Sequence, residues 1–408
     1  MKVGTKSASS FLWMKLQLTR DKTIDVKMPW EKGAGGGSSG HRGGPADVTG
    51  VLLESGDPRG CPVVRLQRRK DAFHLLAAGF VPPPSGTLPT SWEESKFLPD
   101  WSLPSAFQSP QAALAVLSPD LFIRQTTADA LTADGKAASS GDAVKKKLGV
   151  RRAPPSTEKE KPAVQSKAAA PSPFVPISRD GNRFVTAPLD EAPFILQTGL
   201  PEFQVLWLSR LLPEGRRPTA CSVQTAPAAM LSALHEQPEF TAAGGTAMAV
   251  FVTRSSVYFA GYRKGALLLL RECPGAAGYE VMRELVKSGL GVTDDLVDSI
   301  LEDTLSDPRP ALEPLVRPVL QQLQLSLDYL AQRHDVHVDK VFLMGLPAGA
   351  SYWSSFAQET LGVPFISPGV FEGLQLPKSA DAMPADLTPA ASQVFMIALG
   401  AARAAMEG

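Results

Sequence analysis

The sequence predicts an α/β protein made of two related lobes. Two observations support this prediction. A meander of three strands is expected near residues 48–81 and again near residues 246–273, and helix and strand units follow each meander. Strands followed by alternating helices and strands favour a layered α/β architecture. Because the second half repeats the order of the first, we expect a duplicated fold whose two lobes face a common cleft.

The composition is typical of a soluble globular protein, with 44% hydrophobic and 20% charged residues among 408. Lysine plus arginine equals aspartate plus glutamate, at 41 each, so the net charge gives no reason to expect a nucleic-acid or acidic-membrane partner. The three cysteines form no C-x-x-C pair, which argues against a disulfide framework and for a reducing compartment. No apolar run reaches the roughly 18–20 residues that a membrane span needs.

Two segments are poor in core-forming residues. Residues 1–46 end in a Gly/Ser-rich tether, and residues 132–172 are rich in Ala, Ser, Pro and Lys without any aromatic residue. Such segments bury too little apolar surface to offset chain entropy, so we expect both to be disordered. They leave a first lobe made of residues 47–131 and 173–243, and a second lobe made of residues 244–408.

The first lobe alternates apolar runs with turn-forming residues. β-Branched and aliphatic residues bounded by turns such as ESGDPRG predict an opening meander of three strands, VTGVLL, CPVVRLQ and FHLLAAGFV. Further strands are expected at AALAVLS, LFIRQTTA, APFILQTG and TACSVQT. Helical spacing of apolar residues predicts helices at LPEFQVLWLSRLL and APAAMLSALHE.

The second lobe follows the same order. Strands are expected at TAMAVFV, SSVYFAG, ALLLLREC, KVFLMG and VPFIS. Helices are expected at GYEVMRELVKSG, TDDLVDSILEDTL, SYWSSFAQETLG and SQVFMIALGAARAAME. A long helix is expected at residues 312–333, because its apolar positions form one stripe: Val316, Val319, Leu323, Leu327 and Leu330.

Two meanders that each lead into helix and strand units are the layout of the actin, Hsp70 and sugar kinase superfamily. The second half also resembles PilM, the actin-like cytoplasmic protein family of type IV pilus assembly. The resemblance rests on LEPLVRPVLQQLQLSLDYLAQRHDVHVDKVFLMG and SSFAQETLGVPFISPGVFEGLQLP, and it covers most of residues 48–131 and 174–407. The matching positions are Ser326, Leu327, Tyr329, Leu343, Gly345, Leu361, Gly362 and Pro364. The cytoplasmic domain of the type II secretion L family shares this fold.

The sequence departs from the family at its phosphate loops. Actin-like ATPases place an Asp-x-Gly in each of two loops, where aspartate organises magnesium and water and glycine lets backbone N–H groups approach phosphate. The first loop here is GVLLESGDPRG, in which Glu54 and Asp57 are the nearby carboxylates and neither fits that pattern. In the second loop, AVFVTRSSVYF, we place Phe251 at the aspartate position and Thr253 at the glycine position.

A third departure lies in the turn that would contact adenosine. The double glycine of the family has become Gly345-Leu346-Pro347. The candidate cofactor-binding residues of this degenerate nucleotide cleft are Thr253, Ser255, Ser256, Gly345 and Gly349. A strand-to-helix turn also needs glycine for its backbone angles alone, so the turn is explained without a ligand. We identify no catalytic residue, and ATP is the cofactor that this cleft could hold.

Two charged segments are further candidate sites. HDVHVD, residues 334–339, holds two histidines and two aspartates, but it follows a long helix, where histidine favourably meets the helix dipole, so we expect no metal. The basic run at Lys145–Lys147, followed by Arg151 and Arg152, could touch anionic lipid. A solvated charge run is the favoured interpretation.

The resemblance to PilM implies a cytoplasmic scaffold at the inner membrane, in a type IV pilus or type II secretion-like assembly platform. It implies a PilN-like membrane-anchored partner whose short tail docks in a groove, contact with the membrane only through that partner, and no nucleic acid. The three departures favour a pseudo-ATPase that does not hydrolyse ATP. The alternative is an active actin-like ATPase or kinase. It is favoured if Glu54 and Asp57 point into the cleft near Thr253 and Gly345, and the scaffold is favoured if Phe251 and Leu346 fill that space.

Overall fold

The fold is described from a computed structural model of the chain. The residues that the structure describes are 17–18, 24–25, 45–54, 59–70, 72–84, 88–127, 182–189, 194–212, 218–235, 237–241, 245–264, 266–273, 278–302, 307–377, 382–384 and 390–407. The expectation of disorder at residues 132–172 lies outside them, and so does most of residues 1–46. Within the first segment, the short strands β1 (Gln17–Leu18) and β2 (Ile24–Asp25) pair antiparallel.

The first lobe is built on a five-stranded sheet with the order β10-β6-β3-β4-β5. Its antiparallel meander is β3 (Asp47–Glu54), β4 (Cys61–Arg69) and β5 (Ala72–Val81), as the sequence predicted. The strands β6 (Gln111–Leu117) and β10 (Thr219–Thr225) then join in parallel on the other side of β3. All residues of β3 except its two ends are buried, because both faces of this central strand are covered.

The second lobe repeats this arrangement with the order β13-β12-β11-β14-β15. Its meander is β11 (Thr246–Val252), β12 (Val257–Arg263) and β13 (Ala266–Glu272). The strands β14 (Lys340–Met344) and β15 (Phe365–Ile366) follow in parallel. Each lobe therefore places the first strand of its meander at the centre of the sheet, and the predicted duplication is confirmed.

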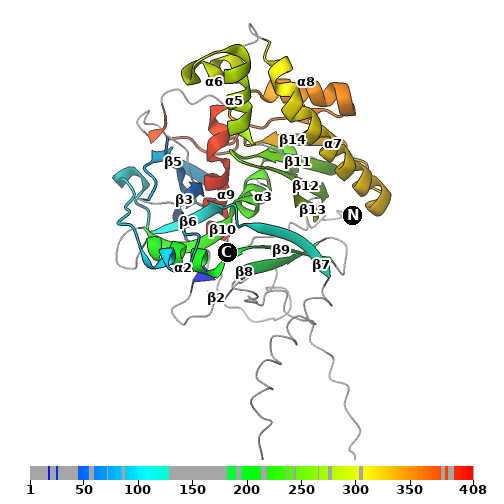
Figure 1. Cartoon of the computed structure of the whole chain (residues 1–408). Helices are drawn as coiled ribbons and strands as arrows, with labels where there is room; N and C mark the ends of the chain where they lie inside the picture. Colours follow the sequence, from blue (N-terminus) through cyan, green and yellow to red (C-terminus); the bar gives the residue numbers. More distant parts are fainter. Residues whose placement is uncertain are drawn as a thin grey trace, which may run out of the picture.

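Two helices pack between the sheets (Figure 1): α3 (Ala226–His235) and α9 (Met396–Glu407). The helix α9 approaches both β3 and α3 at backbone contact. A Cβ added at Gly50 would lie 1.9 Å from the carbonyl oxygen of Ala398, and one at Gly400 would lie 1.8 Å from that of Ala229. Glycine is therefore required at both positions. Although α9 ends the segment assigned to the second lobe, it packs against β3, β4 and β6 of the first sheet.

The outer face of the second sheet is covered by helices, with α7 (Arg309–His334) as the longest (Figure 1). The others are α5 (Tyr279–Leu290), α6 (Asp294–Glu302) and α8 (Ala350–Leu361). The predicted stripe of α7 is confirmed, because Val316, Leu323 and Leu330 are fully buried in the core of this lobe. No helix in the described part of the chain has the length and apolar character needed to cross a membrane.

The first lobe carries an additional three-stranded sheet with the order β7-β9-β8. The sequence predicted strands at β7 (Phe122–Thr127) and β9 (Phe194–Pro201) but not at β8 (Asn182–Pro188). The predicted amphipathic helix is α2 (Glu202–Leu211), and a short helix, α4 (Pro238–Thr241), follows α3. Between β5 and β6 the described chain forms the 3-10 helices η2 (Glu94–Lys96) and η3 (Ser105–Phe107), and η6 (Ala391–Phe395) precedes α9.

Candidate functional site

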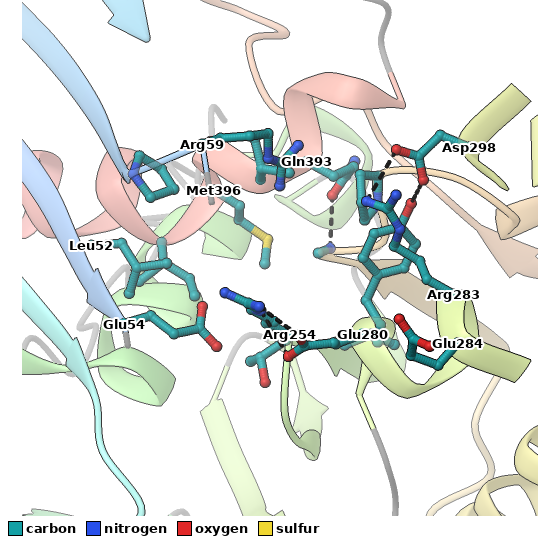
Figure 2. Close-up of a pocket in the computed structure, with 18 of the residues that line it drawn as sticks. Leu52, Glu54, Arg59, Arg254, Glu280, Arg283, Glu284, Asp298, Gln393 and Met396 are labelled. Atoms are coloured by element: carbon teal, nitrogen blue, oxygen red, sulfur yellow. Dashed lines mark hydrogen bonds and ion pairs between the residues drawn. The ribbon is translucent and has the colours of Figure 1, made fainter. Parts of the chain in front are cut away.

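A cavity of about 510 Å³ lies between the two lobes. The first lobe contributes the end of β3 with Glu54, the start of β4, and Arg59 just before β4. The second lobe contributes the β11–β12 turn, one face of α5 and α6, and the turn after β14. The segment at η6 and α9, with Gln393 and Met396, forms a further part of the wall. Figure 2 shows Glu54 and Arg254 pointing into this space from opposite lobes.

The structure brings two of the five predicted site residues to this cavity. Thr253 and Gly345 line it, whereas Ser255, Ser256 and Gly349 are not among its lining residues. Gly349 has a φ of 81° and caps the start of α8, where an added Cβ would pack against Met282 and Leu301. Its role in the described structure is therefore that of a turn and a packing site.

The β11–β12 turn closes on itself through Thr253 and Ser256. The hydroxyl of Thr253 donates to the carbonyl of Ser256 at 2.8 Å and accepts from the backbone N–H of Ser256 at 2.9 Å. The backbone N–H of Thr253 also donates to the carbonyl of Ser256, at 2.8 Å. Phosphate loops bind anions with N–H groups that face the ligand. Here the N–H groups of both residues are occupied within the turn.

The first turn of α5 is joined to the same segment. The N–H groups of Tyr279 and Glu280 donate to the carbonyls of Thr253 and Arg254 at 2.9 and 3.0 Å. A Cβ added at Gly278 would lie 2.4 Å from both carbonyl oxygens, so only glycine permits this approach. A helix N-terminus binds anions through its free N–H groups. At α5 two of these groups are already bonded to protein carbonyls.

Side chains reinforce this junction. Arg254 donates from Nε to Glu280 Oε2 at 2.9 Å and makes a second bond from Nη2, which gives a paired contact between the turn and α5. The hydroxyl of Tyr279 donates to Asp298, which also pairs with Arg283 at 3.4 Å (Figure 2). Burial, followed by the negative charge of Asp298, raises the pKa of the Tyr279 hydroxyl far above its ordinary value. Tyr279 is therefore a neutral donor at physiological pH.

The turn after β14 is fixed by Gln393. The backbone N–H of Gly345 donates to Gln393 Oε1 at 2.9 Å, and Gln393 Nε2 donates to the carbonyl of Pro368 at 2.6 Å. Gly345 has a φ of 83°, and a Cβ added there would lie 2.3 Å from the carbonyl oxygen of Val252. This glycine therefore serves a close backbone approach, and its N–H is bonded to a buried side chain of the protein.

The structure differs from the expected placement of the strand ends. Val252, the last residue of β11, lines the cavity, and Glu54, the last residue of β3, lines it from the first lobe. Phe251 and Leu346, expected to fill the space if the site is degenerate, instead lie in the hydrophobic cores of the molecule. Side chains alternate along a strand, so Phe251 faces away from its neighbour Val252. Asp57 is outside the described residues.

The cavity carries more acidic than basic groups. Six carboxylate side chains and three arginines line it, which gives a formal charge of −3. The carboxylates belong to Glu54, Glu280, Glu284, Asp294, Asp295 and Asp298, and the arginines are Arg59, Arg254 and Arg283. Such a lining disfavours a polyphosphate that brings no cation of its own. No group of His, Cys, Asp and Glu in the described residues is arranged to hold a metal.

The structure resembles several solved structures. It is similar to a chain of the PilM–PilN type IV pilus biogenesis complex, with a TM-score of 0.55 at 15% identity over 88% of this chain and 99% of that chain. The chain has the actin-like fold. A protein of unknown function with an actin-like ATPase fold from Bacteroides thetaiotaomicron gives a TM-score of 0.39 at 9% identity, covering 79% of this chain and 90% of that chain.

A third similarity is to the cytoplasmic domain of EpsL, an inner-membrane component of the type II secretion system of Vibrio cholerae. Its TM-score is 0.28 at 10% identity, covering 60% of this chain and 77% of that chain. No family model matches the sequence. No curated protein matches it. The comparisons thus show the fold and leave the function to be argued from the site.

Sequence reasoning missed the polar face of α5 and the role of Gln393. The signal for the first was present, since Glu280, Arg283 and Glu284 recur at helical spacing in an otherwise amphipathic segment. Whether this face borders the cavity depends on how α5 packs against the rest of the molecule. The spacing of residues in the sequence gives no information on that packing. Gln393 gave no signal, because it bonds to a residue 48 positions away.

Proposed function

We propose that this protein is a PilM-like scaffold of an inner-membrane assembly platform, of the type IV pilus or type II secretion kind. The observation that carries the proposal is the similarity to a chain of the PilM–PilN complex, which spans 99% of that chain and 88% of this one. A likeness over the whole length includes both lobes and not only a shared half. On this proposal, the chain binds the short tail of a PilN-like, membrane-anchored partner.

On this proposal, the protein works in the cytoplasm, peripheral to the inner membrane. Its contact with the membrane runs through the partner. The proposed units are the two lobes predicted from the sequence, residues 47–131 with 173–243 and residues 244–408. The tail would bind as an extended peptide, with backbone hydrogen bonds supplying affinity and side-chain pockets supplying specificity.

We further propose that the scaffold does not hydrolyse ATP. Support comes from the engaged N–H groups of Thr253, Ser256 and the first turn of α5. The proposed nucleotide residues Thr253, Ser255, Ser256, Gly345 and Gly349 would then preserve the shape of a nucleotide site without its anion-binding groups. Actin-like catalysis also needs carboxylates on both loops, and the cavity position at the end of β11 is occupied by Val252.

A second candidate function is that of an active actin-like ATPase or kinase. The observation that favours it is Glu54, which reaches the cavity and begins a Glu-Ser-Gly sequence in place of Asp-x-Gly. A glutamate could hold a magnesium-bound water from one methylene further away. The cavity volume of about 510 Å³ also lies within the range of small-molecule sites.

The scaffold proposal is tested by purification from native membranes. The tagged full-length chain is expected to bring down a single-span protein with a short cytoplasmic tail, and a synthetic peptide of that tail is expected to compete it away. Deletion of the tail from the partner should abolish recovery. Undiminished recovery of the tail-deleted partner, or the absence of any membrane-anchored partner, would overturn the proposal.

A further inference from the structure

The segment between β5 and β6 crosses the outer face of the first sheet, opposite α9. Thr49 on β3 donates from its hydroxyl to the carbonyl of Phe107 at 2.8 Å, while its neighbour Gly50 faces α9. Trp101, Leu103 and Phe107 anchor the segment in the core. Within the described residues 88–110 this crossover contains only the short 3-10 helices η2 and η3. It is the cyan segment at the outer edge of the first lobe in Figure 1.

The crossover is held in one conformation by buried or half-buried side chains that bond to its backbone. Trp207 on α2 donates from Nε1 to the carbonyl of Phe97 at 2.9 Å, and Gln204 on the same helix donates to the carbonyl of Pro89 at 3.0 Å. Trp101 donates from Nε1 to the carbonyl of Pro82 at 2.9 Å. Each bond fixes a loop carbonyl, so the segment is an ordered platform on α2.

This platform presents large apolar side chains to solvent. Trp92, Phe97 and Leu98 are 48%, 79% and 44% exposed. All three lie within a stretch of seven residues. The ring of Trp92 lies 6.0 Å from that of Phe203 on α2, which joins the loop and the helix into one surface. We call Trp92, Phe97, Leu98 and Phe203 the aromatic platform. None of its residues lines the interlobe cavity.

Exposed apolar residues are common on protein surfaces when they are scattered. A cluster on a rigid segment is different, because the segment is ordered at an entropic cost while its apolar surface stays in water. Preorganised aromatic side chains are typical of the anchor positions of protein interfaces, since they bury a large area and lose little rotamer freedom on binding. The cluster is therefore best explained by a partner that covers it.

The charges around the platform indicate the chemistry of that partner. The stretch from Leu88 to Phe107 holds three carboxylates, Glu93, Glu94 and Asp100, against one lysine, Lys96. Lys96 is paired with Glu93 at 2.7 Å, and Glu202 adds a further carboxylate beside Phe203. The hydrogen bond from the backbone N–H of Thr90 lowers the pKa of the Glu94 carboxyl, which keeps it ionised. The segment that carries the platform thus has a formal charge of −2 in a protein of zero net charge, and we call its three carboxylates together with Glu202 the acidic rim.

We propose that the aromatic platform docks an amphipathic, basic segment of a partner protein, with apolar side chains on one face and lysine or arginine beside them. Trp92, Phe97 and Leu98 would be covered by the apolar face, and the acidic rim would pair with the basic groups. An anionic membrane surface is the less favourable occupant, because it would repel the same carboxylates. The inference rests on the exposure of the platform, its bonds to α2 and the charge of its segment, and not on the proposed function.

The test uses the full-length chain and a fluorescein-labelled amphipathic helical peptide of leucine and lysine, of about 18 residues with apolar positions at helical spacing. Binding is measured by fluorescence anisotropy against the same peptide with every lysine replaced by glutamate. The test variant is Phe97→Ser. Leu376→Ser is its matched control, because Leu376 is a comparably exposed apolar residue, 58% exposed, outside the platform.

The lysine peptide is expected to bind saturably and the glutamate peptide is not. Phe97→Ser is expected to weaken binding at least about tenfold, the effect typical of an interface anchor, whereas Leu376→Ser leaves it unchanged. Glu93→Lys should also weaken binding of the lysine peptide, because it replaces a carboxylate of the rim with a positive charge. Equal weakening by Phe97→Ser and Leu376→Ser, or no saturable binding, would overturn the proposal. Binding to phosphatidylglycerol vesicles or self-association that is lost in Phe97→Ser would overturn it as well, and would assign the platform to a membrane or to a second copy.

Discussion

His235, the last residue of α3, is a half-buried titratable side chain. Its ring packs edge-on against Phe240 with centroids 5.4 Å apart. Burial lowers the pKa of this imidazole from its ordinary value to about 3. A position at a helix C-terminus favours the protonated form, but that effect is typically below about 2 kcal/mol, and burial outweighs it. His235 is therefore neutral in the folded protein across the physiological range.

This burial predicts a loss of stability in mild acid. Below the unfolded pKa near 6.5, the unfolded chain binds a proton at His235 that the folded chain does not, so unfolding is favoured progressively as pH falls toward 3. Between pH 7 and pH 5 this one group should reduce the free energy of unfolding by about 2 kcal/mol. Urea denaturation of wild type and His235→Gln at both pH values measures the difference. Equal pH dependence in the two proteins would contradict the prediction.

Gly345 and Gly362 share a left-handed backbone but differ in surroundings. Their φ values are 83° and 67°, and an added Cβ meets the carbonyl oxygen of Val252 at 2.3 Å in the first case and nothing within 4 Å in the second. Gly362→Ala should cost about 1 kcal/mol from backbone strain alone. Gly345→Ala should cost about 3 kcal/mol or more, because the clash is added. Chemical denaturation of both variants checks the order, and similar losses would show that the β14 turn can shift.

At the scale of elements, α7 shows how far periodicity predicts a helix. The expected bounds, residues 312–333, lie within the observed Arg309–His334, and its buried positions follow the predicted stripe. The structure adds one turn at the N-terminal end, and Pro310 lies in this first turn. Proline is tolerated there because the N–H that it lacks would have no intrahelical acceptor.

A matched pair of substitutions on α7 tests its packing. Leu323 is fully buried and Leu325, two residues on, is 57% exposed. Leu323→Asp places a charge without a partner in the core of the second lobe, and we expect a loss of several kcal/mol or failure to fold. Leu325→Asp should change the free energy of unfolding by less than about 0.5 kcal/mol. Thermal and urea unfolding measure both, and an unaltered melting temperature in Leu323→Asp would show that the stripe is not packed as described.

Other elements were less accessible to sequence reasoning. Both meanders were predicted because aliphatic runs bounded by turn residues are local signals. The strand β8 was missed, since its pairing with β9 is made only in the folded sheet. The crossover between β5 and β6 has many prolines, and its order depends on bonds from Trp207 and Gln204, more than 100 residues away. Its sequence alone therefore gave no indication of a fixed platform.

At the scale of the whole molecule, the two lobes are joined by more than the inner helices. Gln375, which follows the second sheet in sequence, pairs with β5 at the edge of the first sheet: its N–H donates to the carbonyl of Phe73 at 3.1 Å, and its carbonyl accepts from Leu75 at 2.9 Å. The two bonds of Gln375 therefore join the lobes through backbone groups of the protein itself. Gln393 links Gly345 and Pro368, all three within the second lobe, at the cavity wall. Such an arrangement suits a scaffold that presents a constant surface.

The candidate site was predictable only where it depends on strand ends. Thr253 and Gly345 follow central strands, and the ends of such strands meet at one edge of their sheet, so they could be placed beside the cleft. Ser255, Ser256 and Gly349 could not be separated from them, because whether a turn residue faces the cavity depends on the hydrogen bonds that close the turn. Only the structure shows that Val252, and not Phe251, faces the cavity at the end of β11.

The last prediction concerns nucleotide binding to the whole molecule. We expect magnesium-ATP to bind weakly or not at all, because N–H groups near the cleft are bonded within the protein and Val252 lies where the second loop would need a carboxylate to hold magnesium. Isothermal titration of the full-length chain with magnesium-ATP should give no heat beyond dilution.

Arg254→Ala is the informative variant, since Arg254 points into the cavity whereas substitution of Gly345 would disturb the fold (Figure 2). Arg317→Ala is its control, in an exposed ion pair with Glu313. A low-micromolar dissociation constant that Arg254→Ala abolishes and Arg317→Ala preserves would establish a nucleotide site in the cavity. It would favour the ATPase with Glu54 as the carboxylate of its first loop.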